Sequence, residues 1–257
     1  MKIFLSALEN GVRYTPWCWL HNLDKLPFRM KWNLMSYYYI RNQRKRAEVI
    51  RDNSEFIMID SGAHSFQKGK KVKWGEYTEQ YAAFIKEFDR PNILGYFEMD
   101  VDAIIGYERV LQLRHILQQA TDKVIPVWHK TRGIKEFDRM CREFSGKIVA
   151  ISGFKNEDIA DDQYLMFLKH AKKYQCKVHC LGMTRRAILD KVPFDYTDSS
   201  SWRQPFTFAR ALINGKQKKV DSDWFRDPRN RDKLELNNYL AGMRMQKEYY
   251  EKWRNVK

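Results

Sequence analysis

The sequence is short of cysteine and has no long apolar run. Its four cysteines, Cys18, Cys141, Cys176 and Cys180, suggest no disulfide framework, so a reducing cytoplasm is the expected compartment. A transmembrane helix would need about eighteen or more consecutive apolar residues, and no such stretch occurs. The opening segment, MKIFLSALENG, has too short an apolar run for a signal peptide. These absences indicate a cytoplasmic protein.

Acidic residues are the minority charge. The chain has 47 Lys and Arg against 32 Asp and Glu, which gives a formal net charge of +15. The basic residues cluster in four separate segments, 41–46, 68–73, 216–219 and 226–233. An excess spread over several loops favours a polyanionic partner, with nucleic acid first. A membrane surface is less favoured, because these segments lack an apolar helical face.

No linker, internal repeat or low-complexity segment interrupts the chain. Hydrophobic residues make up 44% of its 257 residues, which is enough for a sizeable core and argues against disorder. α/β barrels with about this number of residues commonly form a single domain. We therefore expect residues 1–257 to form a single domain.

Short β-rich segments alternate with helical patterns along the chain. The predicted strands are 2–7, 56–60, 93–100, 124–129, 147–152, 177–182 and 194–198, with 206–213 as the candidate for an eighth. Apolar stripes at helical spacing predict helices over 74–88, 107–120, 133–144 and 161–174, and 227–255 is predicted to be one long charged helix. Repeated βα units of this kind predict an α/β fold, a (β/α)₈ TIM-like barrel, with an open doubly wound sheet as the alternative.

Polar residues stand where predicted strands end. Asp60 ends the second strand, Asp100 the third, His129 the fourth and Asp198 the seventh. Catalytic residues of such barrels sit at the carboxyl ends of the strands. A lone acid there is more often a strand terminator or a helix cap. Three acids and a histidine at equivalent positions favour an active site on one rim.

Alternation along the strands assigns these acids to faces. Phe56 and Met58 should share the face of Asp60, and Phe194 and Tyr196 that of Asp198.

Six short motifs, in order from about Phe56 to Trp202, carry a resemblance to a known family. They read DSGAHSF, YFEMD, VIPVWH, AISGF, HCLGMT and FDYTDSSSW. Together they resemble the tRNA-guanine transglycosylase superfamily, and are most similar to its smaller branch from phages and bacterial DNA-modification clusters. That branch exchanges guanine in DNA for a 7-deazaguanine. The resemblance implies this base as co-substrate, no redox or group-carrying cofactor, and the cytoplasm of a bacterial host if a phage encodes the chain.

The resemblance also implies two catalytic acids. Asp198 matches the nucleophile, which would stabilise the oxocarbenium character at C1′ and bond covalently to it. Asp60 would protonate the leaving guanine and then deprotonate the incoming base. Two successive displacements would retain the anomeric configuration.

A base slot is implied beside these acids. Asp100 would accept N–H groups of the base edge, with Asp102 as its rival on the same predicted strand face. His129 would bond the carbonyl oxygen, or is instead a satisfied strand-end histidine. The residues assigned to base binding are Asp100, His129, Gly153, Phe154, His64, Ser61, Leu181 and Gly182, with Gly153 allowing close approach and His64 and Leu181 enclosing the ring.

A polynucleotide must present its base flipped out of the stack. Trp202 and Arg203 follow the nucleophile after three serines and are predicted to brace the flipped nucleotide and hold a phosphate, with a buried core Trp as the alternative. Lys70 and Lys71 are predicted to contact phosphates.

Two departures from the family pattern concern metal and stacking. The tRNA enzymes carry a Cys-x-Cys-x-x-Cys zinc core, which this chain lacks. Cys176 and Cys180 should share a strand face while His179 points away, so no metal site is predicted. His64 stands where the family usually has Phe or Tyr, which implies a weaker stack on the base.

Other functions remain open alternatives. They are the same exchange on tRNA, a non-catalytic nucleic-acid-binding subunit, and a barrel enzyme acting on small phosphorylated metabolites. The sequence also leaves open which 7-deazaguanine is used and whether the chain forms a homodimer.

Overall fold

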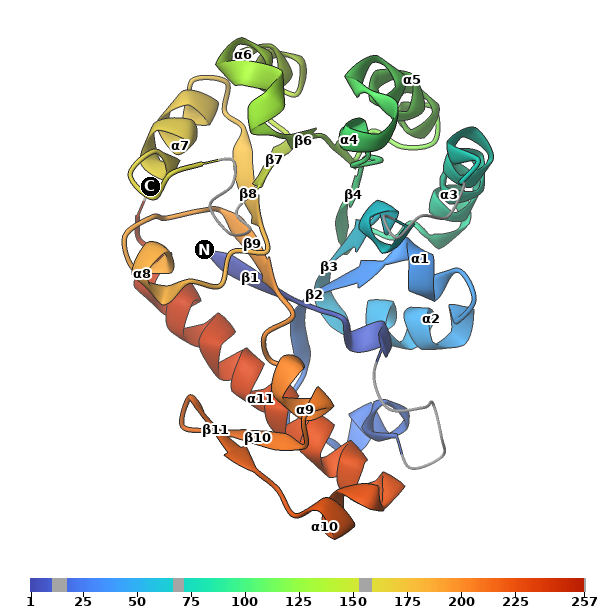
Figure 1. Ribbon diagram of the computed structural model, residues 1–257, viewed down its shortest axis with the longest axis vertical. Helices are drawn as coiled ribbons and strands as arrows, with labels where there is room; N and C mark the ends of the chain where they lie inside the picture. The colour runs from blue at the N-terminus through green and yellow to red at the C-terminus, as the bar shows by residue number, and fades with distance from the viewer. Residues whose placement is uncertain (11–17, 67–71, 153–158, 257) are drawn as a thin grey trace.

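The computed structural model describes residues 1–10, 18–66, 72–152 and 159–256, apart from the side chain of His64. Over these residues nine strands form one parallel sheet, in the order β5-β4-β3-β2-β1-β9-β8-β7-β6. The strands are β1 (Lys2–Ser6), β2 (Met30–Ser36), β3 (Ser54–Asp60), β4 (Ile93–Phe97), β5 (Val124–Ile125), β6 (Val127–Trp128), β7 (Ile148–Ser152), β8 (Lys177–Leu181) and β9 (Tyr196–Ser199). They surround a common axis in Figure 1, with helices outside. The predicted TIM-like barrel is confirmed.

Two of these strands are halves of one. β5 pairs with β4 and β6 pairs with β7, and only Pro126 separates them. Proline has no N–H to donate to a neighbouring strand. Its carbonyl still accepts the Ala150 N–H at 2.8 Å. Counted as one interrupted strand, β5 and β6 close an eight-stranded barrel.

The sequence pattern missed β2, which lies between β1 and β3. Lys31 and Asn33 interrupt its apolar run, and Asn has low β-propensity. Asn33 is nevertheless fully buried, because its Nδ2 donates to Ser54 Oγ at 2.8 Å and its Oδ1 accepts from Tyr239 Oη at 3.0 Å. Tertiary hydrogen bonds therefore satisfy the polar side chain of Asn33 within a core strand.

Including β2 moves the strand count by one. Asp60 ends the third strand, Asp100 follows the fourth, His129 follows the fifth, and Asp198 lies in the eighth. All four remain at carboxyl ends, so the predicted rim is unchanged.

The prediction of an eighth barrel strand at 206–213 was wrong. That segment begins in α9 (Gln204–Thr207) and continues as β10 (Arg210–Ile213), which pairs antiparallel with β11 (Lys216–Lys219) in a separate hairpin. Asn214 and Gly215 connect the two with φ of 50° and 74°. Two positive φ values are what a tight type I′ hairpin turn requires.

The predicted outer helices are present. They are α3 (Trp74–Phe88), α5 (Tyr107–Gln118), α6 (Gly133–Glu143), α7 (Tyr164–Lys172) and the long α11 (Pro228–Trp253). Shorter elements connect the rest: α1 (Tyr37–Ile40), α2 (Arg44–Asp52), α4 (Asp102–Ile105), α8 (Arg186–Leu189), α10 (Ser222–Arg226), η1 (Leu8–Asn10), η2 (Trp19–Lys25), η3 (Ala63–Phe66) and η4 (Lys130–Arg132).

Two apolar clusters hold the fold. One fills the barrel interior and includes Met58 and Tyr196, with Phe56 packed against it. The larger one lies between the sheet and the helices. The predicted face of Phe56 and Met58 is thus confirmed, but that of Phe194 was wrong. Phe194 precedes β9 and packs against Tyr164 of α7, 5.5 Å between ring centroids.

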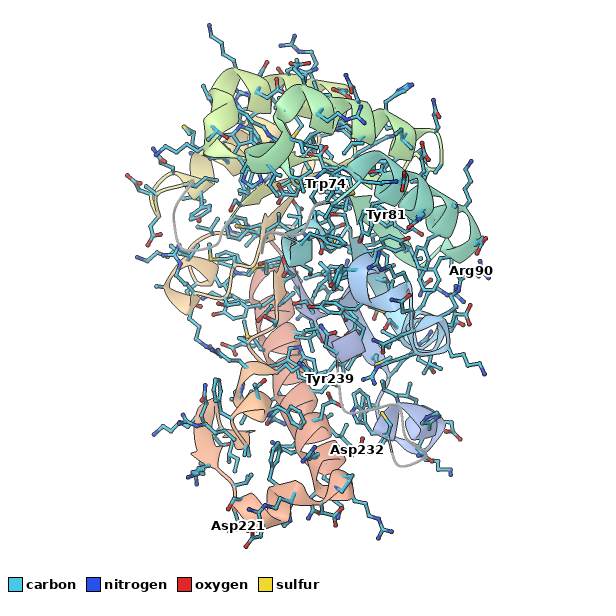
Figure 2. The ribbon with its side chains drawn as sticks, turned by 45° about the vertical axis from the view of Figure 1, so that its right-hand side comes forward. Trp74, Tyr81, Arg90, Asp221, Asp232 and Tyr239 are labelled. Carbon is cyan, nitrogen blue, oxygen red and sulfur yellow. The ribbon has the colours of Figure 1, made fainter. Side chains whose placement is uncertain are left out.

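Helix α11 runs antiparallel to β1. Gln246 Nε2 donates to the carbonyl of Ile3, near the start of β1, while Gly242 lies against Leu5, near its end. The first turns of α11 therefore continue past the carboxyl end of β1. There they carry α9, the β10–β11 hairpin and α10, which we call the arm (residues 204–233). Figures 1 and 2 show the arm below the barrel in these views, and Figure 2 labels Asp221 near its tip.

Within the described residues, no helix has both the length and the apolarity needed to cross a membrane.

Candidate active site

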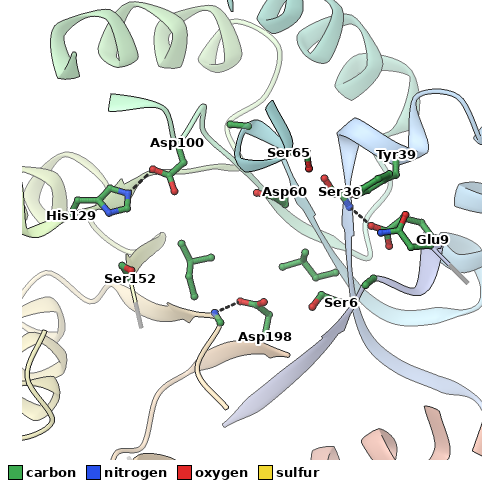
Figure 3. Close-up of a pocket in the computed structure, with 16 residues that line it drawn as sticks. Ser6, Glu9, Ser36, Tyr39, Asp60, Ser65, Asp100, His129, Ser152 and Asp198 are labelled. Atoms are coloured by element: carbon green, nitrogen blue, oxygen red, sulfur yellow. Dashed lines mark hydrogen bonds and ion pairs between the residues drawn. The ribbon is translucent and has the colours of Figure 1, made fainter. Parts of the chain in front are cut away.

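A pocket of about 400 Å³ opens at the carboxyl ends of the strands. Five of its lining residues bear carboxyl or imidazole groups: Glu9, Asp60, Asp100, His129 and Asp198. Figure 3 shows Asp100 and His129 at one end and Glu9 at the other, with Asp60 and Asp198 between them. Four predicted site residues therefore share one cavity with a fifth group that the sequence pattern did not reveal.

Asp198 is held by one of its two oxygens. Its Oδ1 accepts from the Gly182 N–H at 2.8 Å and bonds His179 Nε2 at 3.0 Å. Both of these bonds use Oδ1, and neither uses Oδ2. The side chain is 15% exposed and lines the cavity. An anchored carboxylate with its second oxygen uncommitted by these bonds has the arrangement that a nucleophile needs.

His179 is a site residue that the prediction missed. The imidazole is fully buried inside the barrel, with the ring of Phe97 edge-on at 5.0 Å and Phe4 at 6.3 Å. Its Nδ1 has no hydrogen-bond partner among the described residues. If Asp198 is ionised, the hydrogen must be on Nε2, because only that nitrogen faces the carboxylate. The sequence signal that could have revealed His179 was the alternation along the strand, which places His179 on the face opposite to Cys176 and Cys180.

Asp60 is fixed by the turn that follows β3. Its Oδ2 accepts from the Gly62 N–H at 2.9 Å. Gly62 has φ of +75°, and a Cβ there would lie 2.4 Å from Tyr38 Cβ. Only glycine fits that turn without a shift of the backbone. Ala63 and Ser65 continue into the cavity wall, so the small residues after Asp60 leave space beside the acid.

Glu9 is the second residue that the prediction missed. It lies in η1 after β1 and is 3% exposed. Oε1 accepts from the Ser36 N–H at 3.0 Å, and Oε2 has no partner among the described residues. Burial raises the pKa of Glu9 to about 7, and the nearby charge of Asp60 adds to this rise. Nothing in the local sequence distinguishes this glutamate from an exposed loop acid.

Asp100 and His129 form a direct pair. His129 Nε2 lies 2.5 Å from Asp100 Oδ1, and the side chains of His129 and Asp100 are 21% and 17% exposed. Each therefore keeps a surface toward the cavity. The prediction placed both in the base slot but did not foresee their contact.

A buried network of charged side chains lies next to the Asp100–His129 pair. Glu98 is fully buried and accepts from Arg114 Nε at 2.5 Å and from the Val127 N–H at 2.8 Å. Arg132 Nη1 lies 3.4 Å from Glu98, and its Nε donates to Asp102 at 2.9 Å. This network links the end of β4 to the start of β6.

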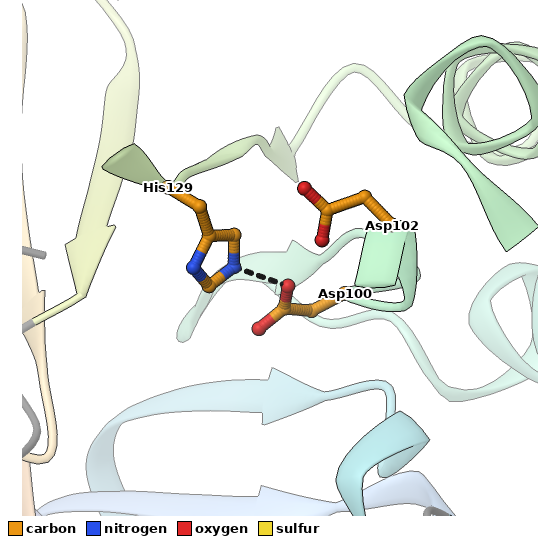
Figure 4. A group of neighbouring side chains, drawn as sticks. All are labelled: Asp100, Asp102 and His129. Carbon is orange, nitrogen blue, oxygen red and sulfur yellow. Dashed lines mark hydrogen bonds and ion pairs between the residues drawn. The ribbon is translucent and has the colours of Figure 1, made fainter. Parts of the chain in front are cut away.

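Asp102 was predicted on the strand face of Asp100, and this was wrong. It lies in α4, pairs with Arg132, and does not line the cavity. Ligand atoms of Asp100, Asp102 and His129 do lie within 4.8 Å of one another, as Figure 4 shows, and this set could hold a cation. The guanidinium of Arg132 already neutralises Asp102, which disfavours a second positive charge there.

The remaining base-slot predictions divide into three groups. Leu181 and Gly182 line the cavity, as does Ser152. Ser61 does not: it is fully buried beneath the turn, and its carbonyl accepts from Tyr77 Oη at 2.8 Å. Its predicted contact with the base is therefore not supported. The residues that lie outside the described part of the structure are Gly153, Phe154, Lys70, Lys71 and the side chain of His64.

Trp202 is a core residue, so its predicted contact with a nucleotide was wrong. It is 2% exposed, donates through Nε1 to the Ser6 carbonyl at 2.9 Å, and packs edge-on against Tyr239 of α11. Arg203 is also engaged within the protein. It donates to the Asn10 carbonyl and lies 3.8 Å from Glu235, and burial lowers its pKa. These contacts hold its guanidinium within the protein, and its role toward a phosphate stays a prediction.

All four cysteines are buried and free. Cys176 and Cys180 belong to the outer cluster, while His179 faces the interior.

Comparisons of the chain with protein-family models, with curated proteins and with solved structures found no match. The function must therefore be inferred from the chain itself, from its fold and the geometry of its pocket.

Proposed function

We propose that this protein is a DNA-guanine transglycosylase, which exchanges guanine in DNA for a 7-deazaguanine through a covalent intermediate on Asp198. The observation that carries the proposal is the anchoring of Asp198 by His179 and the Gly182 N–H, in a cavity shared with Asp60. The resemblance of the six strand-end motifs supports the same function.

The reaction needs two displacements at C1′. In the first, an Asp198 oxygen bonds to C1′ while the bond from C1′ to N9 of guanine breaks, and Asp60 gives a proton to the leaving base. In the second, Asp60 takes the proton from the incoming base. That base then bonds to C1′ and frees the Asp198 carboxylate. Asp60 ends in its starting state, and the configuration at C1′ is retained.

Asp100 and His129 are suited to hold the base edge. A carboxylate accepts N–H groups, and a doubly protonated imidazole that is bonded to Asp100 through Nε2 still has its Nδ1–H to donate to a carbonyl oxygen. Their direct contact fixes both orientations before a base arrives. Leu181 supplies an apolar wall for a planar ring.

The net charge of +15 favours a nucleic acid as the carrier of the base. The missing zinc motif and the DSSSW segment favour DNA over tRNA. The decisive assay offers guanine-labelled duplex DNA and unmodified tRNA side by side, each with a 7-deazaguanine base. We expect label to be released from DNA.

Matched variants complete this assay. Asp198→Asn should release no label, whereas Asp24→Asn, at an exposed carboxylate in η2, should behave as wild type. Release from tRNA but never from DNA would replace the proposal by its tRNA alternative. Release from neither, with DNA binding retained, would favour a non-catalytic subunit.

A further inference from the structure

The arm concentrates exposed positive charge. Between residues 204 and 233 it has four aspartates, while eight lysines and arginines are exposed: Arg210, Lys216, Lys218, Lys219, Arg226, Arg229, Arg231 and Lys233. The β10–β11 hairpin contributes the first four of these cations and no acid. Among the ion pairs of the described residues, none involves these four, in contrast to Arg226, which pairs with Asp223.

Within the hairpin, one cation lies opposite another. Arg210 lies directly opposite Lys219 in the register of β10 and β11. Side chains directly opposite in an antiparallel pair share one face, and like charges there are destabilising. Among the described residues, the hydrogen-bond partner of Arg210 Nη1 is the neutral Gln217, at 3.3 Å. A bound anion would relieve this repulsion.

Exposed apolar side chains lie among these charges. Phe208 is 63% exposed just before β10, Ile213 is 41% exposed at its end, and Trp224 is 38% exposed in α10. Rings beside cations are suited to a nucleic acid, whose bases stack on aromatics and whose phosphates attract Lys and Arg.

The arm lies at the same end of the barrel as the pocket. Because α11 runs antiparallel to β1, its turns before Gly242 extend beyond the carboxyl end of that strand, by about 20 Å at 1.5 Å per residue. The chain also enters the arm at Gln204, shortly after Asp198.

The hairpin is held firmly in this position. Asn238 of α11 accepts from the Leu212 N–H at 2.7 Å and donates to the Arg210 carbonyl at 3.0 Å. Asn237 donates to the Leu212 carbonyl at 3.3 Å. These bonds tie β10 to α11, so the cations of the β10–β11 hairpin are positioned before any ligand binds.

We infer that the arm is a second nucleic-acid contact, which grips the phosphate backbone of duplex DNA beside the nucleotide held in the pocket. The hairpin cations contact phosphates, and Phe208 lies against the polynucleotide next to them. This inference rests on the proposed function only in taking the polymer to be DNA.

The test neutralises the hairpin and compares it with a matched surface. The variant carries Lys216→Gln, Lys218→Gln and Lys219→Gln. The control carries Lys172→Gln, Lys173→Gln and Lys177→Gln, which removes the same charge from exposed residues at the opposite end of the barrel. Binding of a fluorescent duplex is measured by anisotropy between about 50 and 200 mM salt, where phosphate contacts dominate the salt dependence. Thermal melting checks that both proteins are folded.

We expect the hairpin variant to bind about tenfold or more weakly, with a salt slope reduced by up to about 0.9 for each phosphate that the hairpin no longer neutralises. The control should match wild type. An unchanged affinity and slope in the hairpin variant, or an equal weakening of binding in both variants, would overturn the inference. So would a wild-type protein that does not bind the duplex.

Base exchange on the same duplex separates this inference from the proposed function. If duplex binding depends on the arm but no base is exchanged, the inference about the arm stands and the proposed transglycosylase function is rejected. If wild type exchanges the base but binding does not depend on the arm, the proposed function stands and the inference about the arm is rejected.

Discussion

His179 Nε2 lies 3.0 Å from Asp198 Oδ1, although the imidazole is fully buried among the rings of Phe4 and Phe97. A buried imidazole that contacts a carboxylate fixes which oxygen remains for chemistry. Both partners of this pair should therefore be needed for base exchange, in different ways.

Asp198→Asn is expected to abolish base exchange while leaving folding and duplex binding intact, because an amide cannot serve as the nucleophile. On a denaturing gel, wild type incubated with DNA and a base analogue should show a covalent protein–DNA adduct that the variant lacks. Exchange at a near wild-type rate in Asp198→Asn would remove this residue from its role.

His179 should act as a positioning residue for Asp198. His179→Leu removes a hydrogen bond to a charged group, worth about 1.5–3 kcal/mol, and should lower kcat by about ten- to a hundredfold with little change in KM. His179→Gln keeps an N–H donor and should recover part of the rate. If the two variants are equally impaired, the histidine serves packing alone.

Asp60 should be needed for proton transfer. Asp60→Asn is expected to lower exchange by a factor of about a hundred or more and to remove the pH dependence that the acid imposes. Full activity of this variant across the pH range would make Asp60 a structural residue.

Ala63 should set the room beside Asp60. It is 1% exposed and lines the cavity, so Ala63→Leu should fill space that the base needs. We expect a raised KM for the free base with duplex binding unchanged. An unaltered KM would place the base elsewhere in the pocket.

Glu9 should make stability fall as pH rises. Its pKa is about 7 in the folded protein and 4.5 in the unfolded reference, so the folded state binds more protons between these values. The stabilisation is complete below pH 4.5 and is lost as pH rises through about 7, by on the order of 3 kcal/mol. Urea unfolding of wild type and Glu9→Gln from pH 5 to 8 should show this loss in wild type only. Parallel curves for the two proteins would contradict it.

The strand-end residues were predictable because period-2 alternation and barrel topology together determine where a strand's last polar residue lies. Asp60, Asp100, His129 and Asp198 all reach one cavity for this reason. The alternation can be seen within each strand, and the barrel topology follows from the repeated βα units.

The missed residues depend on partners far away in sequence. Glu9 is buried by its contact with Ser36, and Asn33 became part of a strand through Tyr239. Trp202 is covered by α11, and the residues that flank Trp202 in the sequence do not indicate this contact. Burial of this kind is set by tertiary packing and overrides local preference.

Pro126 has a consequence for how the barrel can open. Since Val127 donates its N–H to the side chain of Glu98 instead of to a strand carbonyl, the seam between β4 and β6 is fastened by a carboxylate. Asp100 and His129 stand on either side of that seam. A local opening there, of the kind that amide hydrogen exchange detects, would part Asp100 from His129, the pair that we propose holds the base edge. Asp198 and His179, on strands β9 and β8, would keep their bond, so the proposed recognition of the base and the proposed cleavage at C1′ rest on parts of the barrel that can move separately.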